Sequence, residues 1–323
     1  MHSLCRVKEA LDRAVRAVVR DCLEVQAGEE VLVVCNPVTE ELGALLRIEA
    51  EVEGADATLA VISERESAAA EPPRTVAEAM VAADVVIAPT LQSLSHTASR
   101  RRASEAGARI ASMPGVTEEM LARLMGGDIS DLRRRSRQLA DQLEAGAAAR
   151  ITCPRGSDLR LGIEGRNAIP DGGELGKRGA FGNLPCGEAF IAPLEGTAEG
   201  ALVVDGSIAA IGTVEEPVRM TIRDGHLTEA GGEDGARLIA LLKKHGEDGT
   251  NVAELGIGTN ESATLTGNVL EDEKILGTAH VAFGASAAIG GTVQVPVHLD
   301  CVVLEPTVEI DGTTVLRAGE LLV

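Results

Sequence analysis

The first half of the chain alternates between helical and strand patterns. Apolar residues at helical spacing predict a helix over 4–25 that stops at Gly28. A second helix is predicted over 40–53, with Thr39 as its cap and Gly54 as its end. Short, continuous apolar runs predict buried parallel strands at 31–36, 57–62, 84–89 and 108–113. Helices that alternate with such strands are typical of a parallel α/β sheet. No strand leads into a GxGxxG sequence, so nothing here indicates a dinucleotide site.

The second half has a different pattern, with short alternating strands and many turns. A charged helix over 129–146 precedes it, and a helix over 233–246 interrupts it. Three sequences predict hairpin turns: DGS (205–207), RDGH (223–226) and IDGT (310–313). We therefore expect an α/β domain with a parallel sheet over 1–148, followed over 149–323 by an α+β domain dominated by antiparallel sheet.

The composition is that of a globular protein with an aliphatic core, since the chain has 45% hydrophobic residues, three Phe, no Trp and no Tyr. Thirty basic and 50 acidic residues give a net charge of −20, which disfavours nucleic acids and anionic membranes as partners. The acidic excess suits metal cations or a substrate with a positive end, or it serves solubility alone. Six separated cysteines without a CxxC pair indicate neither a disulfide framework nor a cysteine zinc site. Without an apolar signal core or a membrane-spanning run, we expect a cytoplasmic protein.

Four segments of the second half place ionisable residues in apolar or glycine-rich surroundings. They are NLPCGEAFIAP (183–193), VAELGIGTNE (252–261), ILGTAHVAFG (275–284) and VPVHLDCV (295–302). The residues concerned are Glu188, Glu254, His280, His298 and Asp300. A buried charge is costly unless it is paired or bound to a metal, and carboxylates with imidazoles form the ligand sets of zinc, manganese and iron. We interpret the chain as a metalloenzyme; a hydrogen-bonded core position is the alternative for each residue taken alone.

VPVHLDCV is the most specific of these segments. Residues two apart on a strand point to the same face, so His298 and Asp300 project together. The opposite face carries Val297, Leu299 and Cys301. Pro296 cannot donate to a strand ladder, which predicts an edge strand or a bulge. The pair is either half of a metal site or a hydrogen-bonded His–Asp pair in the core.

The charges of the five residues bear on the number of metal ions. Glu188, Glu254 and Asp300 contribute −3, which two divalent ions and one bridging hydroxide would balance. One iron held by His280, His298 and Asp300 would instead leave the two glutamates in need of other partners. In VAELGIGTNE the two glycines, 256 and 258, allow a close approach of backbone.

The four segments also resemble, in order and wording, the aminopeptidase T family of dinuclear metallo-aminopeptidases. The similar segments of that family read Asn-x-Pro-x-Gly-Glu, Ala-Glu-Leu-Gly-x-Gly-Thr-Asn, Glu-Lys-x-Leu-Gly-Thr-x-His and His-x-Asp, and they cover roughly residues 180–312 here. The resemblance implies Glu188, Glu254, His280, His298 and Asp300 as ligands of two zinc, cobalt or manganese ions. It also implies an α/β N-terminal domain and a homodimer.

On this resemblance we expect an aminopeptidase that hydrolyses small peptides with a metal-activated water. Glu188 would then shuttle the proton to the leaving amine, and the acidic field would hold the α-amino group of the peptide. The chain differs from the family's peptidases in two ways. It has no tyrosine after His280, where GASAAIGG (284–291) stands, and only 18 residues separate His280 from His298.

Two alternatives remain open at this point. The same family includes dihydroxypyridine ring-cleaving dioxygenases, which use one Fe(II) on two histidines and one carboxylate, a set that His280, His298 and Asp300 would supply. A metal-stabilised protein without catalysis is the other alternative. For the homodimer there is one independent indication, the apolar, small-residue segment AFGASAAIGGTV (282–293), which either packs against a partner or forms a buried turn.

Overall fold

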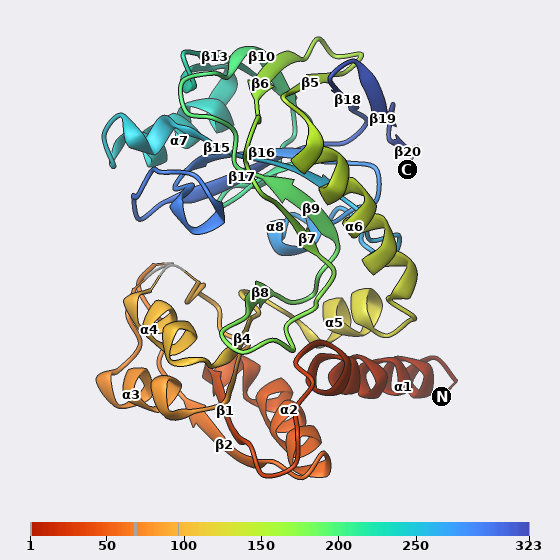
Figure 1. The fold of residues 1–323 in the computed structure, drawn as a ribbon, viewed down its shortest axis with the longest axis vertical. Helices are drawn as coiled ribbons and strands as arrows, with labels where there is room; N and C mark the ends of the chain where they lie inside the picture. Colours follow the sequence, from red (N-terminus) through yellow and green to blue (C-terminus); the bar gives the residue numbers. More distant parts are fainter. Residues whose placement is uncertain (1, 68–69, 96, 323) are drawn as a thin grey trace. The chain divides into compact units, whose positions relative to one another are not determined.

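The computed structural model describes residues 2–67, 70–95 and 97–322, with side chains from residue 8 onward, and the chain forms two compact units (Figure 1). Unit 1 comprises residues 1–129 and 173–186, and unit 2 comprises residues 130–172 and 187–323. This division differs from the predicted boundary near 148. The helix α6 (Ser130–Ala145) packs against strands of unit 2, and residues 173–186 return to unit 1 to add a strand to its sheet.

Unit 1 is built on a parallel sheet in the order β2-β1-β3-β4-β8. Its strands are β1 (Glu30–Cys35), β2 (Asp56–Val61), β3 (Val85–Ala88), β4 (Arg109–Ser112) and β8 (Phe181–Asn183). Its helices are α1 (His2–Arg16), η1 (Ala17–Cys22), η2 (Pro37–Thr39), α2 (Glu40–Val52), α3 (Arg74–Ala82), α4 (Ala98–Ala106) and α5 (Glu118–Met125). The apolar runs form the strands because helices cover both faces of the sheet.

Alternate residues of each strand of unit 1 enter separate layers of the core. Leu32, Val34 and Val86 pack with α3 and α4 around Met80 and Ala103. On the other side, α2 packs against β1 and β2, and α1 packs against α2 and α5. The predicted α/β fold with a parallel sheet is therefore confirmed for the N-terminal part.

Unit 2 contains two antiparallel sheets that enclose one core. Sheet B has the order β14-β13-β10-β6-β5-β18-β19-β20, and sheet C has the order β12-β11-β17-β16-β15-β9-β7. The strands of sheet B are β5 (Ala148–Thr152), β6 (Asp158–Gly162), β10 (Glu199–Val204), β13 (Val218–Arg223), β14 (His226–Ala230), β18 (Thr307–Ile310), β19 (Thr313–Arg317) and β20 (Glu320–Leu321). Those of sheet C are β7 (Ala168–Asp171), β9 (Glu188–Ile191), β11 (Ser207–Ile208), β12 (Gly212–Thr213), β15 (Val252–Gly258), β16 (Ala279–Gly284) and β17 (His298–Val303).

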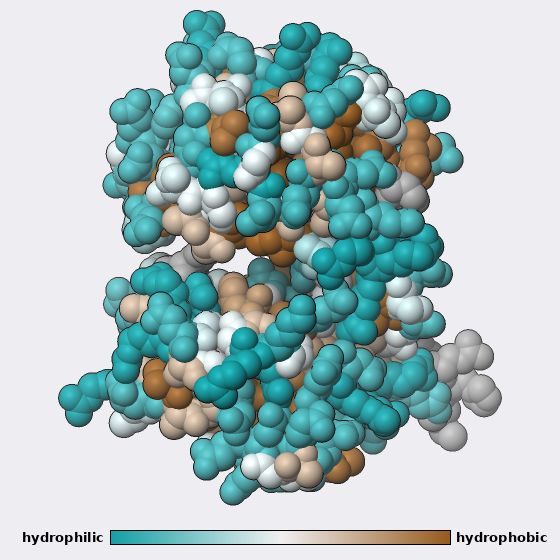
Figure 2. Space-filling view, in the orientation of Figure 1, coloured by the Kyte–Doolittle hydropathy of each residue, from teal (hydrophilic) through white to brown (hydrophobic). Residues whose placement is uncertain are grey.

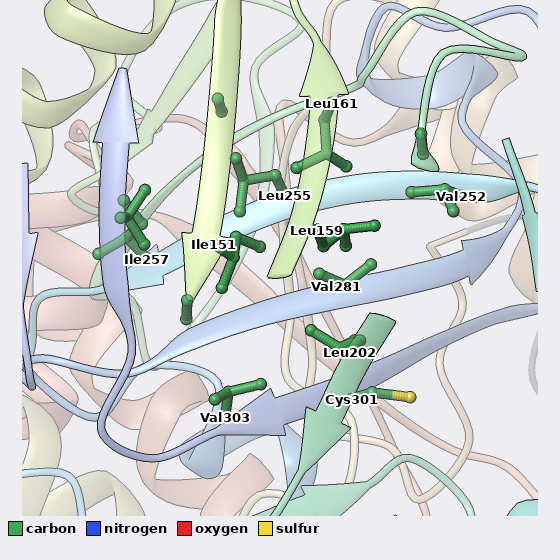
Figure 3. Packing of buried hydrophobic residues seen from close by; sticks show 14 of the residues in the cluster. Ile151, Leu159, Leu161, Leu202, Val252, Leu255, Ile257, Val281, Cys301 and Val303 are labelled. Carbon is green, nitrogen blue, oxygen red and sulfur yellow. The ribbon is translucent and has the colours of Figure 1, made fainter. Parts of the chain in front are cut away.

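Aliphatic side chains from both sheets interlock between them (Figure 3). Ile151, Leu159 and Leu202 come from sheet B, and Leu255 and Val281 come from sheet C. The remaining elements are α6, α7 (Gly232–Lys243), α8 (Val269–Asp272), η3 (Asp248–Thr250) and η4 (Ala287–Ile289). The predicted α+β fold with dominant antiparallel sheet is confirmed for this part.

Two of the three predicted hairpin turns are present. Asp224–Gly225 and Asp311–Gly312 have positive φ and join β13 to β14 and β18 to β19, as the strand twist requires. The prediction for 205–207 is wrong, because β10 belongs to sheet B and β11 to sheet C. Asp205 instead accepts a hydrogen bond from the backbone N–H of Leu304 where the chain crosses between the sheets.

Two local predictions also need correction. Thr39 precedes α2, but its hydroxyl donates to the carbonyl oxygen of Pro89 and does not cap the helix. The strand β17 is not at an edge, because it pairs with β16 on one side and with β11 at Cys301 on the other. Pro296 lies before the first paired residue, His298, so the proline costs the ladder no hydrogen bond.

Hydrophilic residues cover most of the visible face of each unit (Figure 2), which agrees with the charge of −20. The described residues contain no helix long and apolar enough to cross a membrane.

Candidate metal centre

The five predicted ligands lie on one face of four adjacent strands of sheet C. Alternation along each strand sends Leu255, Val281 and Cys301 into the core between the sheets, and their neighbours to the opposite face. That opposite face receives Glu188 from β9, Glu254 from β15, His280 from β16, and His298 with Asp300 from β17. The register places Ala282 opposite both Glu254 and Asp300, so two residues that are 46 positions apart in sequence meet here.

The two glycines of β15 make room for the site. A Cβ atom at Gly256 would lie 2.0 Å from Nε2 of His280, so the imidazole rests directly on this glycine. A Cβ atom at Gly258 would lie 2.1 Å from the carbonyl oxygen of Ile275, where the chain after Lys274 crosses the strand. The expected close approach is thus made by backbone at Gly258 and by a side chain at Gly256.

Glu254 joins two groups of possible metal ligands. Its Oε1 lies 3.2 Å from Nε2 of His280, and its Oε2 lies 3.4 Å from Nε2 of His298. Glu188, Glu254 and His280 form the first group, and Glu254, His298 and Asp300 form the second. Within each group, one ligand atom per residue lies within 4.8 Å of the others.

Hydrogen bonds orient the histidines only in part. Nδ1 of His298 donates to the carbonyl oxygen of Ala285 at 2.7 Å, which leaves Nε2 facing Asp300 Oδ1 at 3.5 Å. Nδ1 of His280 is buried and has no hydrogen-bond partner among the described residues. Glu188 Oε2 lies 3.1 Å from Nε2 of His280, but outside hydrogen-bond geometry, so it is a second buried atom without a hydrogen bond.

A buried lysine completes the cluster. Nζ of Lys274 donates to Glu188 Oε1 at 3.0 Å and forms a second ion pair with Glu273. The Lys274 side chain is fully buried. Neither Lys274 nor Glu273 was among the predicted site residues, although the Glu-Lys pair lies in the EKILGTAH segment. Two adjacent charges before a buried strand were the signal that could have found them.

The pKa values reflect this mixture of buried charges. Burial lowers the pKa of His280, but Glu188 and Glu254 raise it, and the result is well above the ordinary value. The pKa of His298 is raised in the same way by Asp300 and Glu254. Burial raises the pKa of Asp300, but His298 lowers it to about 2. Burial raises the pKa of Glu273 to about 8, against the influence of Lys274.

These values describe a site that attracts cations. Each imidazole Nε2 faces carboxylate oxygens, and protons on the imidazoles or a metal ion can satisfy that field. Carboxylate oxygens and imidazole nitrogens in this number fit a divalent transition metal. The structure therefore brings all five predicted residues together in groups that could hold a metal ion, while their role as ligands stays a prediction.

The fold and the site together define a class of enzymes that have one α/β unit and one unit of two antiparallel sheets. The second unit carries a cluster of carboxylates and imidazoles. The chain belongs to the 2,5-dihydroxypyridine 5,6-dioxygenase (NicX) family, whose model matches residues 10–323.

A curated relative and two solved structures are similar to this chain. The 2,5-dihydroxypyridine 5,6-dioxygenase of Pseudomonas putida is 24% identical over 258 residues, which is 76% of this chain and 72% of that protein. A solved structure of 2,5-dihydroxypyridine dioxygenase from Pseudomonas putida matches with a TM-score of 0.84 at 20% identity, covering 97% of this chain and 96% of that one. AmpT from Thermus thermophilus matches with a TM-score of 0.73 at 22% identity, covering 98% and 100%.

The comparisons confirm the suspected family link and bear on the predicted reaction. The family and the curated relative carry the dioxygenase name, whereas the aminopeptidase prediction has the support of one structural neighbour. At such identity that neighbour shows the fold alone. The dioxygenase alternative is thus better supported than the predicted aminopeptidase.

Proposed function

We propose that the protein is an Fe(II)-dependent ring-cleaving dioxygenase that acts on a dihydroxypyridine-like aromatic compound. The observation that carries the proposal is the family match over residues 10–323. His280, His298 and Asp300 would hold the iron as a set of two histidines and one carboxylate. When bound, Fe(II) supplies the redox chemistry with O2 that no side chain of the cluster can supply.

Lys274 supports a single metal ion. One iron on His280, His298 and Asp300 requires other partners for Glu188 and Glu254. Glu188 has such a partner in the ammonium group of Lys274. Glu254 faces Nε2 of both imidazoles, the atoms that would hold the iron, so the charge of the ion itself would balance this carboxylate. Glu273, with its pKa raised to about 8, is protonated at neutral pH, so the Lys274 charge offsets one of the charges of Glu188, Glu254 and Asp300, and one divalent ion matches the remaining two.

Glu188 is the residue of the cluster best placed to move a proton. Burial raises its pKa, but Lys274 and His280 lower it below the ordinary value, so the carboxylate stays ionised. Oε1 is held by Lys274, while Oε2 makes no hydrogen bond with a described residue. We assign Oε2 to accept the proton of a substrate hydroxyl group, with Lys274 keeping the carboxylate in place.

The test is O2 consumption with 2,5-dihydroxypyridine after anaerobic reconstitution with Fe(II). We expect consumption with about one iron per chain, and its loss in His298→Ala and Asp300→Ala together with most of the bound iron. Glu305→Ala, which removes a carboxylate outside the cluster, is the matched control. Full iron content in the two ligand variants would show that the site assignment is wrong.

A second candidate is a dinuclear aminopeptidase, and one observation favours it. The two possible ligand groups share Glu254, which is the arrangement of a carboxylate between two ions. This function predicts about two zinc, cobalt or manganese ions per chain and release of amino acids from free but not N-acetylated dipeptides. That result, without O2 consumption, would replace the dioxygenase proposal.

A further inference from the structure

The carboxyl-terminal edge of the sheet in unit 1 carries an arginine with unusual surroundings. Arg100 lies in the first turn of α4, and its Nε donates to the carbonyl oxygen of Ser95 at 2.8 Å. Its guanidinium lies over the ring of Phe181, 4.3 Å from the centroid. No described residue forms an ion pair with Arg100, whereas Arg102 on the same helix pairs with Glu78.

Neutral polar side chains that follow or end three strands are linked to this arginine through Ser95. Ser95 follows β3, Ser112 ends β4, and Asn183 ends β8. The hydroxyl of Ser95 lies 3.1 Å from that of Ser112 and 3.4 Å from Oδ1 of Asn183. Phe181 and Asn183 are two apart on β8, so they share a face. Hydroxyl and amide groups can donate to an anion, but they leave the positive charge of Arg100 unbalanced.

An uncompensated, half-buried guanidinium is costly for the unit. Burial and the neighbouring Arg101 lower the pKa of Arg100, and the opposing influence of Glu105 is smaller. An external anion would stabilise the charge of an arginine in such surroundings. The planar guanidinium binds an anion in a bidentate manner through its N–H donors. The groups that contact the guanidinium, the carbonyl of Ser95 and the ring of Phe181, are neutral, so its single charge matches a monoanion. Ligands of open α/β sheets also bind outside the carboxyl ends of the strands, where this group lies.

We propose that Arg100, Ser95, Ser112 and Asn183 form a binding site for the carboxylate group of a small organic molecule. The guanidinium binds the carboxylate oxygens, Phe181 fixes the plane of the guanidinium, and the serine and asparagine groups donate to the same anion. The site lies within unit 1 and needs no metal. It is therefore independent of the reaction assigned to the cluster in unit 2.

Benzoate is the probe, and the full-length chain is used in a buffer with a chelator, so that no metal ion can bind the carboxylate. The Nε–Hε resonance of Arg100 in the 15N-labelled protein is assigned by its loss in Arg100→Lys. We expect benzoate to shift this resonance saturably in the wild-type protein. Arg100→Gln should weaken benzoate binding in calorimetry by about tenfold or more, the value of a charged hydrogen bond. Arg101→Gln removes the same charge from an exposed neighbour and should bind as the wild type does.

Asn183→Asp tests the site without removing the arginine. The change keeps the size of the side chain and adds an internal carboxylate to the group, so it should also weaken benzoate binding by about tenfold or more. Circular dichroism checks that each variant is folded. Equal benzoate binding by the wild type, Arg100→Gln and Asn183→Asp would overturn the proposal. Saturable binding of inorganic phosphate in place of benzoate would overturn it as well.

Discussion

At the scale of single residues, the buried charge of Lys274 has the largest effect on the electrostatics of the site. A fully buried ammonium group stands between Glu188 and Glu273, and Asp171 on the neighbouring strand β7 adds to the negative field around it. Burial lowers the pKa of Lys274, but these carboxylates raise it well above the ordinary value. The lysine is therefore a permanent cation inside an acidic cluster, and it fixes the position of Glu188.

We predict that Lys274→Met lowers the free energy of unfolding of the metal-free protein by about 3–5 kcal/mol, because it leaves buried carboxylates without their partner. Urea unfolding measures the change. Lys244→Met, at an exposed position after α7, is the matched control and should stay within about 0.5 kcal/mol of the wild type. Equal stability of the two variants would mean that the buried ion pair adds nothing to the fold.

At the scale of elements, Glu195 and Arg166 hold the connection between β16, which carries His280, and β17, which carries His298. We call these two residues the clamp. Glu195 accepts a hydrogen bond from the backbone N–H of Thr292 at 2.7 Å and pairs with Arg166. Arg166 also donates to the carbonyl oxygen of Gly290. At the start of the same connection, Ala285 accepts the hydrogen bond from Nδ1 of His298. Glu195 is in this sense a positioning residue for a histidine that it does not touch.

Glu195→Ala should weaken metal binding by about 10- to 100-fold, the range seen when groups that orient a ligand are removed. Competition with a chromophoric chelator measures the affinity. Amide hydrogen exchange in residues 285–293 should accelerate in the same variant, which a change confined to the metal ligands would not cause. Glu164→Ala, at an exposed position near Arg166, is the control. Unchanged exchange in 285–293 would show that the clamp does not order this connection.

At the scale of the whole molecule, each unit has its own core. Helices enclose the sheet of unit 1, and the two sheets of unit 2 enclose theirs. The small-residue segment 282–293 is only partly buried. Its first residues belong to β16, whereas Ala288 and Gly290, in and after η4, are exposed. A simple buried turn, the alternative to a partner contact, is thus not what the segment forms.

The homodimer stays a prediction, and light scattering at micromolar concentration tests it. We expect about twice the chain mass of 33.4 kDa, since an exposed stretch of small apolar residues can pack against a second copy. Ala287→Glu should then shift the mass toward the monomer, and Ala287→Ser should not. A wild-type mass near 33.4 kDa contradicts the dimer. A dimer that Ala287→Glu leaves intact places its interface elsewhere.

The sequence by itself determined the type of fold and indicated five of the residues that form the cluster. Continuous apolar runs such as 31–36 predict buried strands because both faces of a parallel sheet are covered. The hairpins at 224–225 and 311–312 follow from local turn chemistry. Alternation along β17 placed His298 and Asp300 on the face opposite Cys301. All of these features depend on neighbours within a few residues, which the linear sequence shows.

Only the tertiary structure decided which distant segments meet. The crossing of the chain at Asp205 from sheet B to sheet C looks like a hairpin turn in sequence, because the local residues of the two cases are the same. The return of 173–186 to unit 1 depends on the pairing of β8 with β4, which no local pattern encodes. The sequence places Lys274 beside Glu273 but does not show its partner Glu188, which lies 86 residues away and meets Lys274 only in the folded chain. Long-range contacts of this kind arise from the packing of the whole unit, and a one-dimensional pattern does not contain them.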